Sequence, residues 1–281
     1  MALPEKQIIF SHLLREEPRT GVLGFQTWLL GASQAALGKT PADAAAFVDA
    51  RITRLWNDVQ RENEVLVRAG LSPVLRVVDE KSRLFEFAAQ GKLGGDRAAA
   101  LRWIATIGNA QFEYLGAALA FFCGAPEFAV TKRGGDRGVD FYALVPAWGG
   151  SGVFHTPHKH LRVVGQSKYL DGSVQRKDSD ALISVLHKIR LKSENMRDYV
   201  PDWFWKARGP VVGIILSQYG FASGTVTECN ENGVLLAGSV DIAESIVSSR
   251  RFVKSRMAGR SVQETLSEAI STVPKFEPIA A

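Results

Sequence analysis

The sequence is poor in cysteine and contains no long hydrophobic run. Only Cys123 and Cys229 occur among its 281 residues, which is too few for a disulfide scaffold or a four-cysteine zinc site. No segment approaches the roughly 18 consecutive apolar residues that a membrane helix needs. The first residues also lack the uninterrupted apolar stretch of a secretory signal peptide. These absences predict a reduced, cytoplasmic protein that does not enter a membrane.

Internal repeats, heptad runs and low-complexity tracts are absent as well. Because 46% of the residues are hydrophobic, the chain can form a sizeable core, and disorder on this scale is excluded. A chain of this length accommodates one large domain, or a core of about 150 residues with an appended module.

Basic residues exceed acidic ones only slightly, but they are unevenly distributed. The 34 Lys and Arg residues outnumber the 29 Asp and Glu residues by five, an excess that many unrelated proteins share. Between residues 131 and 192, however, basic side chains crowd together with histidines. They are Lys132, Arg133, Arg137, Lys159, Arg162, Lys168, Arg176, Lys177, Lys188, Arg190 and Lys192, with His155, His158 and His160. We expect an acidic ligand to bind in this part of the chain.

The pattern of helix and strand signals changes near residue 95. Residues 1–95 predict a mainly helical region, in which Thr40, Pro41 and Asp43 form a helix-start signal. The glycine-rich stretch GKLGGD at 91–96 marks a boundary. Helices and strands then alternate over 96–255, which is typical of an α/β layered fold, and 256–281 is expected to be a C-terminal tail. The expected strands are 139–145, 161–169, 211–216 and 234–237, and the expected helices are 98–107, one capped by Asn109, 178–191, 224–230 and one from Asp241.

Two of the expected strands bring a carboxylate, an amide and an amine together. Gln166 and Lys168 lie two apart in one strand, so their side chains project from the same face. If this strand pairs with the preceding one as a hairpin with its loop at 146–160, Asp140 lies beside Gln166.

Such a group suits metal-assisted hydrolysis of phosphodiesters. A hard cation such as Mg²⁺ takes oxygen ligands, commonly one or two carboxylates with waters and a phosphate oxygen, and it lowers the pKa of a bound water. A nearby lysine can orient that water and offset the charge that builds on the phosphate. Glu113, on the preceding helix, is flanked at helical spacing by Gly116, Ala117 and Ala120, and this small-residue face would let it approach the same cation.

Spacing alone does not establish this site. An Asp in one strand and a Gln-x-Lys in the next occur together by chance in many proteins. A solvated strand edge with an ordinary ion pair is the simpler structural explanation, and it stays open on these grounds.

Three stretches carry further motifs in a defined order. They are QFEYLGAALAFFCGAPEFAVTKRGGDRGVDFYAL (111–144), VVGQSKYLDGSVQRKDSDALISVL (163–186) and GIILSQYGFASGTVTECNENGVLLAGSVDIAESI (213–246). They contain a helix with a Phe-Glu pair, a GGDxGxD turn before a strand, a Gln-x-Lys strand, and a strand, turn and closing helix. Over roughly residues 111–250, about half of the chain, this arrangement resembles the Mrr-like restriction endonuclease family of the PD-(D/E)XK superfamily.

The resemblance implies a restriction-endonuclease-like core at 96–255, with a central mixed sheet flanked by helices. At the matching positions it implies a metal-binding Asp140, an amide of Gln166 where most of the superfamily has a carboxylate, and a catalytic Lys168. The helical Glu113 would help to compensate for the missing carboxylate, and the backbone carbonyl of Ser167 would also bind the metal. The implied cofactor is Mg²⁺, with Mn²⁺ as an alternative.

The resemblance also implies an activity and its partners. The activity is endonucleolytic hydrolysis of DNA in bacterial restriction or phage defence, by a homodimer or higher homo-oligomer because one site cuts one strand. The candidate DNA-binding residues are Lys132, Arg133, Arg137, His158, Arg176 and Lys177. For Arg176 and Lys177 a solvated surface is an equal alternative.

Three other motifs are less specific. His155, His158 and His160 have metal-ligand spacing, but no cysteine or carboxylate lies close by to complete a zinc site. The glycine-rich stretch at 134–138 precedes a strand, whereas a dinucleotide-binding turn follows one. The aromatic run WFW at 203–205 could stack on bases, and a packed flap or subunit contact is the alternative.

Both cysteines are expected to be small core residues.

Two other functions stay open. The first keeps the fold but makes it a nucleic-acid-binding or junction-processing module with weak or no cleavage. The second is a non-nuclease interaction protein that shares only the layout. Absence of any DNA affinity at low salt would favour the second of these.

Overall fold

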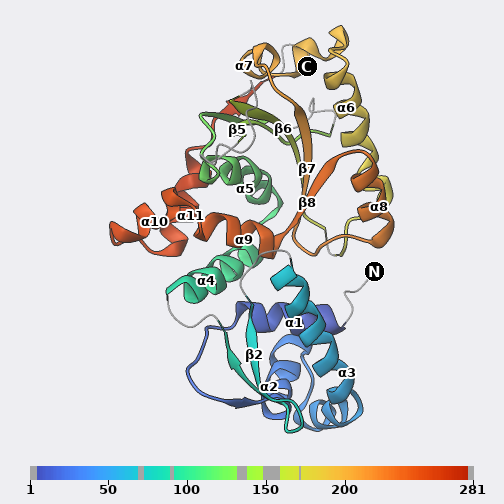
Figure 1. Cartoon of the computed structure of the whole chain (residues 1–281), viewed down its shortest axis with the longest axis vertical. Coiled ribbons are helices and arrows are strands. Elements are labelled where there is room, and N and C mark those ends of the chain that lie inside the picture. Colours follow the sequence, from blue (N-terminus) through green and yellow to red (C-terminus); the bar gives the residue numbers. More distant parts are fainter. Residues whose placement is uncertain are drawn as a thin grey trace. The chain divides into compact units, whose positions relative to one another are not determined.

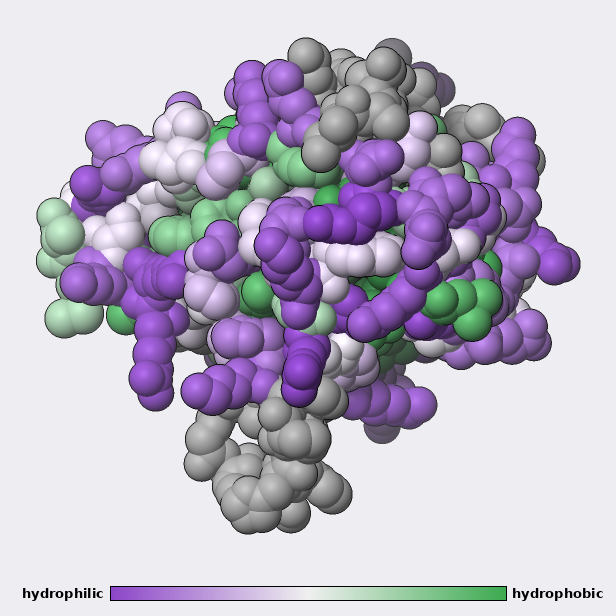
Figure 2. Space-filling view, turned by 90° about the horizontal axis from the view of Figure 1, so that it is seen from above, coloured by the Kyte–Doolittle hydropathy of each residue, from purple (hydrophilic) through white to green (hydrophobic). Residues whose placement is uncertain are grey.

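The computed structural model describes residues 5–68, 73–88, 92–131, 138–147, 159–170 and 172–277. The chain forms two units, Met1–Arg102 and Trp103–Ala281, so the division falls within helix α4 (Lys92–Thr106) rather than at residue 95 (Figure 1). Within the described ranges, no helix combines the length and the apolar character needed to cross a bilayer. Hydrophilic residues cover most of the molecular face shown in Figure 2.

The smaller unit combines helices with a small sheet. Its elements are α1 (Glu5–Arg15), β1 (Leu23–Gly24), α2 (Phe25–Leu37), α3 (Pro41–Arg68), β2 (Leu75–Asp79) and β3 (Leu84–Phe87), with the strand order β1-β3-β2. Helix α3 begins where the sequence predicts, and the Asp43 amide donates to the Thr40 hydroxyl at 3.2 Å. Phe25, Trp56 and Phe85 are buried and pack ring against ring. The sheet was not expected, because strands this short give weak periodic signals in a helical region.

A six-stranded mixed sheet forms the centre of the larger unit. Its strands are β4 (Glu127–Thr131), β5 (Phe141–Pro146), β6 (His160–Lys168), β7 (Val211–Ser217), β8 (Val234–Gly238) and β9 (Lys275–Phe276), in the order β8-β7-β6-β5-β4-β9. Strands β5 and β6 are antiparallel, as the expected hairpin requires, and β6, β7 and β8 are parallel. The helices are α5 (Asn109–Phe122), α6 (Asp180–Arg190), α7 (Asp202–Lys206), α8 (Ser223–Glu231), α9 (Ser239–Val247), α10 (Arg250–Met257) and α11 (Val262–Ser271). The predicted α/β class, with a central mixed sheet flanked by helices, is confirmed.

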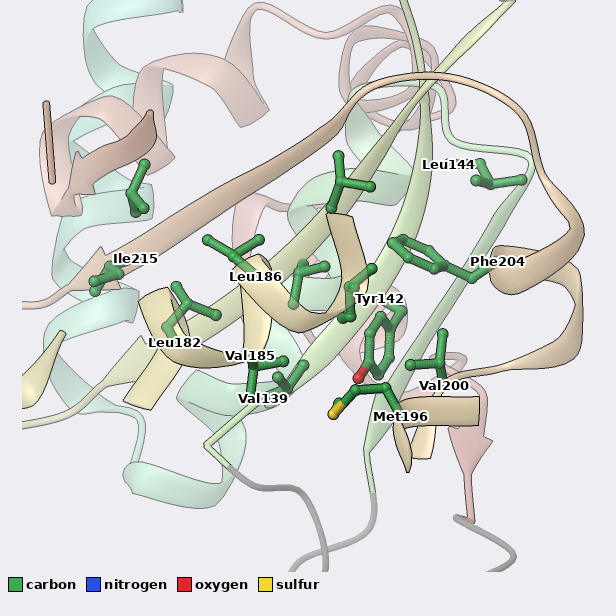
Figure 3. Packing of buried hydrophobic residues seen from close by; sticks show 14 of the residues in the cluster. Val139, Tyr142, Leu144, Leu182, Val185, Leu186, Met196, Val200, Phe204 and Ile215 are labelled. Atoms are coloured by element: carbon green, nitrogen blue, oxygen red, sulfur yellow. The ribbon is translucent and has the colours of Figure 1, made fainter. Parts of the chain in front are cut away.

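Helices α5 and α6 cover opposite faces of this sheet. Tyr142 of β5 and Leu182 of α6 belong to the main hydrophobic cluster (Figure 3), which also contains Val164 of β6. The neighbouring Phe141 points to the other face, as alternation along a strand requires. There a Cβ built on Gly116 of α5 would lie only 2.6 Å from the Phe141 ring. Glycine at position 116 therefore sets how closely α5 approaches the sheet.

The last part of the chain is folded and is not a free tail. The Glu264 amide donates to the Ser261 hydroxyl at 3.1 Å at the start of α11, and Leu266 of this helix is fully buried. Strand β9 then pairs in parallel with β4. The expectation of a tail over 256–281 is therefore corrected for residues 262–276. Ser261 and Glu264 form a Ser-x-x-Glu capping box, a helix-start signal that the sequence interpretation overlooked.

Candidate functional site

The candidate site lies at the edge of the sheet where β5 begins and β6 ends. The Asp140 amide donates to the Gly165 carbonyl at 2.9 Å, which continues the strand pairing beyond β5. The Ser167 amide donates to Asp140 Oδ2 at 2.6 Å. The Asp140 carboxylate therefore lies against the β6 backbone between Gln166 and Lys168.

Gln166 contributes a buried oxygen to this edge. The residue is 4% exposed, and its Oε1 atom has no hydrogen-bond partner. Its Nε2 atom faces Gly138, where a built Cβ would lie 3.3 Å away. Gly138 has a φ of +85°, so both the backbone conformation and the space favour glycine at this turn. A buried oxygen without a partner costs roughly 1–3 kcal/mol, a cost that a bound cation or water would remove.

Lys168 is the last residue of β6. It is half-buried and lies opposite Ser217 in the parallel register with β7. Because it is two residues from Gln166 in a regular strand, the two side chains leave the same face of the sheet. Asp140 directly precedes β5, and its carboxylate lies beside the Ser167 amide, between Gln166 and Lys168 in the chain.

Helix α5 packs onto the same end of β6. A Cβ built on Gly116 would lie 2.7 Å from Ser167 Oγ. One turn earlier, the Phe112 and Tyr169 rings are 6.0 Å apart between centroids. Glu113 follows Phe112 and lies three residues before Gly116, so it occupies the face of the helix that passes Ser167. Helix α5 thereby places Glu113 near the end of β6, on the face toward which Ser167 points. Because Gln166 and Lys168 leave the opposite face, a cation shared with Glu113 would lie beyond the end of the strand.

Buried oxygens without partners gather at this edge. In the described part of the chain, all the buried side-chain nitrogen and oxygen atoms that lack a hydrogen bond are Thr131 Oγ1, Gln166 Oε1, Ser167 Oγ and Gln218 Oε1. Thr131 ends β4, and its amide donates to the Asp140 carbonyl at 2.8 Å. Gln218 directly follows β7. Nearly all buried polar groups in folded proteins are paired, so a ligand or an ordered water at this edge would supply the partners that these atoms lack.

Sequence reasoning missed Thr131 and Gln218. Thr131 ends strand β4, which is not among the strands expected from the sequence. Gln218 follows the apolar run of β7, which by itself suggests only burial. The available signal was its position, because ligands of open α/β sheets bind beyond the carboxyl ends of parallel strands.

The oxygen donors at this edge fit a hard cation. Mg²⁺ prefers carboxylate, carbonyl and water oxygens, and the Asp140 carboxylate and Gln166 Oε1 are both present beside the β6 backbone. Among the described residues, no group of three or more His, Cys, Asp and Glu side chains could hold a metal ion. A cation at this edge would therefore depend on amide and carbonyl oxygens as well as on carboxylates.

Most of the expected DNA contacts lie outside the described residues. Arg176 and Lys177 are described: Arg176 forms an ion pair with Glu228 at 3.1 Å, and Lys177 is exposed. Arg176 thus has a carboxylate partner within the protein. The other four expected DNA contacts, Lys132, Arg133, Arg137 and His158, lie outside the described ranges, as does His155 of the histidine motif.

The aromatic run at 203–205 packs into the core. Phe204 is fully buried and lies 5.0 Å from Tyr142 between ring centroids (Figure 3). Trp203 and Trp205 are partly buried against the same cluster. This packing favours a packed structural role for residues 203–205 over stacking on bases.

The two cysteines have different surroundings. Cys229 is buried in the main cluster, and burial raises the pKa of its thiol, as expected for a core residue. Cys123 follows α5 and is exposed, so the expectation of a core position is wrong for this residue. The helix ends at Phe122, which leaves Cys123 outside the apolar stripe.

Comparisons with known proteins give structural similarities only. No protein-family model matches the chain, and no curated protein gives a significant match. Among solved structures, it is similar to the MspJI restriction endonuclease in complex with a 27-mer oligonucleotide, with 19% identity and a TM-score of 0.41 over 67% of this chain and 39% of that chain. It is also similar to the restriction endonuclease FokI bound to DNA, with 8% identity and a TM-score of 0.34 over 97% and 48%. A third similar structure is that of protein VC1899 from Vibrio cholerae, with 10% identity and a TM-score of 0.26 over 88% of this chain and 56% of that chain.

This chain spans less than two thirds of the length of each of these proteins. None of the TM-scores reaches 0.5, so the functional proposal depends on the geometry of the site.

Proposed function

We propose that this protein is a Mg²⁺-dependent endonuclease that hydrolyses DNA phosphodiester bonds. The observation that carries the proposal is the 2.6 Å hydrogen bond from the Ser167 amide to Asp140, because it fixes a carboxylate between Gln166 and Lys168. The unpartnered oxygen of buried Gln166 supports it. The resemblance of the same residues to the Mrr-like restriction endonuclease motifs is consistent with this activity.

Four groups would hold the cation. They are the carboxylates of Asp140 and Glu113, the side-chain oxygen of Gln166 and the backbone carbonyl of Ser167. When bound, Mg²⁺ polarises the phosphate and lowers the pKa of a coordinated water. The Ser167 amide keeps the Asp140 carboxylate in one orientation, and burial of Gln166 keeps solvent away from its oxygen.

Lys168 would act directly on the reacting atoms. Its ammonium group would donate a hydrogen bond to the attacking water and offset the negative charge that builds on the phosphate. Because Gln166 and Lys168 both pair with β7, opposite Ile215 and Ser217, the Lys168 backbone is held in a fixed position relative to Gln166. Rigid placement of this kind lets a charged group act without first being reorganised.

DNA is the proposed partner, and a second copy of the chain is part of the proposal. One site cuts one strand, so double-strand cleavage would use a homodimer or a higher homo-oligomer. Bacterial restriction or phage defence is the proposed setting. The proposed phosphate contacts remain those of the basic region: Lys132, Arg133, Arg137, His158, Arg176 and Lys177.

Cleavage of plasmid DNA with and without Mg²⁺ tests this function. Modified and unmodified plasmids are compared, because the base recognised is not specified by the site. The proposal expects Mg²⁺-dependent nicked or linear product that is lost in Lys168→Ala and Asp140→Ala while DNA binding persists. Lys206→Ala is the control for loss of a lysine, because Lys206 pairs with Asp202. Metal-independent cleavage, or full activity in Lys168→Ala, would contradict the proposal.

DNA binding without efficient cleavage is the second candidate function. It is favoured by the neutral amide of Gln166, since a carboxylate would bind a divalent cation more strongly. The variant Gln166→Glu separates the two candidates. The endonuclease proposal expects it to retain Mg²⁺ binding and cleavage, whereas a binding module would cleave in neither form. If Gln166→Glu binds Mg²⁺ no better than Gln166→Ala, Gln166 is not a ligand.

A further inference from the structure

Helix α10 and the turn after it form a strongly basic segment. The sequence RRFVKSRMAGR at 250–260 contains no acidic residue. Its charge of +5 equals the net charge of the whole chain. The basic residues are Arg250, Arg251, Lys254, Arg256 and Arg260. This segment lies outside the basic region that the sequence interpretation singled out.

The helix places several of these charges unfavourably. Arg250 and Arg251 lie in its first turn, directly after the Ser249 N-cap, where the helix dipole disfavours cations. Arg250 and Lys254 are four residues apart and exposed, so two like charges lie on one face of the helix and repel each other. An anion bound along this face would remove the repulsion.

A groove of about 640 Å³ lies between α10, α11 and the end of α5. Arg251, Lys254 and Arg260 line it together with Phe121 and Phe122. Arg251 is held in place, because it donates to the Phe121 carbonyl at 2.7 Å and its guanidinium lies 4.1 Å from the centre of the Phe121 ring. The groove thus has three basic side chains and one acidic side chain, Glu268, beside an aromatic wall.

The acidic residues of α11 are already engaged. Glu268 pairs with Arg260, and Glu264 accepts a hydrogen bond from the Ser261 amide at 2.7 Å. In the part of the chain that the structure describes, Arg250 and Lys254 form no ion pair with a carboxylate. Their charges are therefore available to an external anion.

We propose that α10 and this groove bind the sugar–phosphate backbone of duplex DNA away from the cleaved bond. The proposal rests on the proposed function in taking DNA as the ligand. Phe112 of α5 packs against Tyr169, directly after β6, and Phe122 packs against Phe252 of α10. About 15 Å of helix therefore separates the two places. Duplex DNA carries one charge per about 1.7 Å. A duplex at the site therefore has phosphates within reach about four or five base pairs away.

The shape of α10 argues against a lipid surface as the ligand. Its largest apolar residue, Phe252, is buried in the protein. Only Val253 and Met257 are exposed apolar side chains on this helix, and two such residues give too small an apolar face for insertion between lipids. Basic groups without a broad apolar face match a phosphate backbone better.

Duplex binding by the full chain, measured over a range of salt concentrations without divalent cations, tests the inference. The variant is Arg250→Gln/Lys254→Gln. The proposal expects roughly tenfold weaker binding at low salt and a salt dependence reduced by about two released counterions. The matched control is Arg197→Gln/Lys206→Gln, which removes the same charge from residues that pair with Asp202. The control is expected to bind DNA as the unmodified chain does.

Each outcome decides the matter. An unchanged salt dependence in the α10 variant would overturn this inference, even if the chain cleaves DNA with Mg²⁺. Weakened binding in the α10 variant alone, with no cleavage by the unmodified chain, would support this inference and overturn the proposed nuclease function. Vesicles containing phosphatidylserine and a polyglutamate peptide are tested as alternative ligands. If the α10 variant loses binding to either of them while its DNA binding is unchanged, the inference is overturned in favour of a lipid surface or an acidic peptide. Thermal unfolding of both variants confirms that they fold.

Discussion

The hydrophobic cluster and the site edge of the larger unit bury polar groups in different ways. In the cluster, the Tyr142 hydroxyl donates to the Tyr199 carbonyl at 3.2 Å, and Arg162 Nε, at its margin, donates to the Gly209 carbonyl at 3.0 Å. At the end of the sheet where Asp140 lies, four buried side-chain oxygens of the described residues have no hydrogen-bond partner. Both regions belong to the same sheet and use the same strands.

We interpret this difference as one between a region that stabilises the fold and an edge whose polar groups a ligand would pair. A paired buried polar group contributes roughly 1 kcal/mol, whereas an unpaired one costs roughly 1–3 kcal/mol. Four unpaired oxygens at one edge therefore destabilise the ligand-free protein, and a bound ion, water or phosphate would remove this cost. Removing an apolar side chain from the cluster should therefore lower the free energy of unfolding. Replacing an unpaired polar side chain at the site edge by an apolar one should raise it.

Phe204→Ala should have the largest effect and should act on the cluster alone. Phe204 is fully buried against Tyr142, so its removal leaves a cavity and should lower the free energy of unfolding by about 3–5 kcal/mol. Urea denaturation measures this loss. A loss below about 1 kcal/mol would show that the cluster is not the stabilising region.

Lys168→Ala should affect the site alone. Loss of the ammonium group should reduce kcat for DNA cleavage by about 10²–10³-fold, with little change in the midpoint of thermal unfolding. Single-turnover cleavage and thermal unfolding are measured on the same preparation. A large drop in unfolding temperature would instead assign Lys168 to the stability of the strand.

Gly116→Ala should affect both regions, because the added Cβ would lie 2.6 Å from Phe141 and 2.7 Å from Ser167. We expect a loss of about 1–3 kcal/mol in unfolding free energy from overpacking, together with reduced cleavage as Ser167 is displaced. Gly31→Ala is the matched control, because a Cβ at Gly31 in α2 meets nothing within 4 Å. That variant should be stabilised by about 0.5–1 kcal/mol. Equal responses of the two variants would contradict the close packing of α5.

Gln166→Met should change the free energy of unfolding least, and the sign of that change tests the account. Removing an unpaired buried amide while keeping the side-chain volume should raise the free energy of unfolding by about 1 kcal/mol, and cleavage should be lost with the metal ligand. Calorimetry and the plasmid assay measure the two quantities. If Gln166→Met is clearly destabilised, the amide has a partner in the free protein and is not held for a ligand.

Much of the sheet and its helices could be predicted from the sequence. The apolar stripe of Phe112, Leu115, Leu119 and Phe122 defines α5, although the helix is capped by Gly108 rather than by Asn109. The continuous β-branched run predicts β7 as a strand covered on both faces. These elements carry strong local signals, and the structure has them within one or two residues of the expected bounds.

The elements that were missed depend on contacts distant in the sequence. Strand β4 is five residues long and becomes a strand by pairing with β5 on one side and β9 on the other. The paired positions of β9 lie more than 140 residues away, at Lys275 and Phe276. Thr131 and Gln218 are ordinary polar residues in the sequence, and only tertiary packing buries their oxygens. Burial of this kind cannot be read from local periodicity.

The position of a bound divalent ion is the most direct test of the account. Anomalous scattering from Mn²⁺ in crystals of the protein locates the ion and its ligands without requiring activity. The account predicts one ion within about 2.2 Å of an Asp140 carboxylate oxygen and of Gln166 Oε1, with the Lys168 ammonium on the same side of the sheet. An ion bound elsewhere, or Asp140 and Lys168 on opposite sides of the sheet, would contradict it.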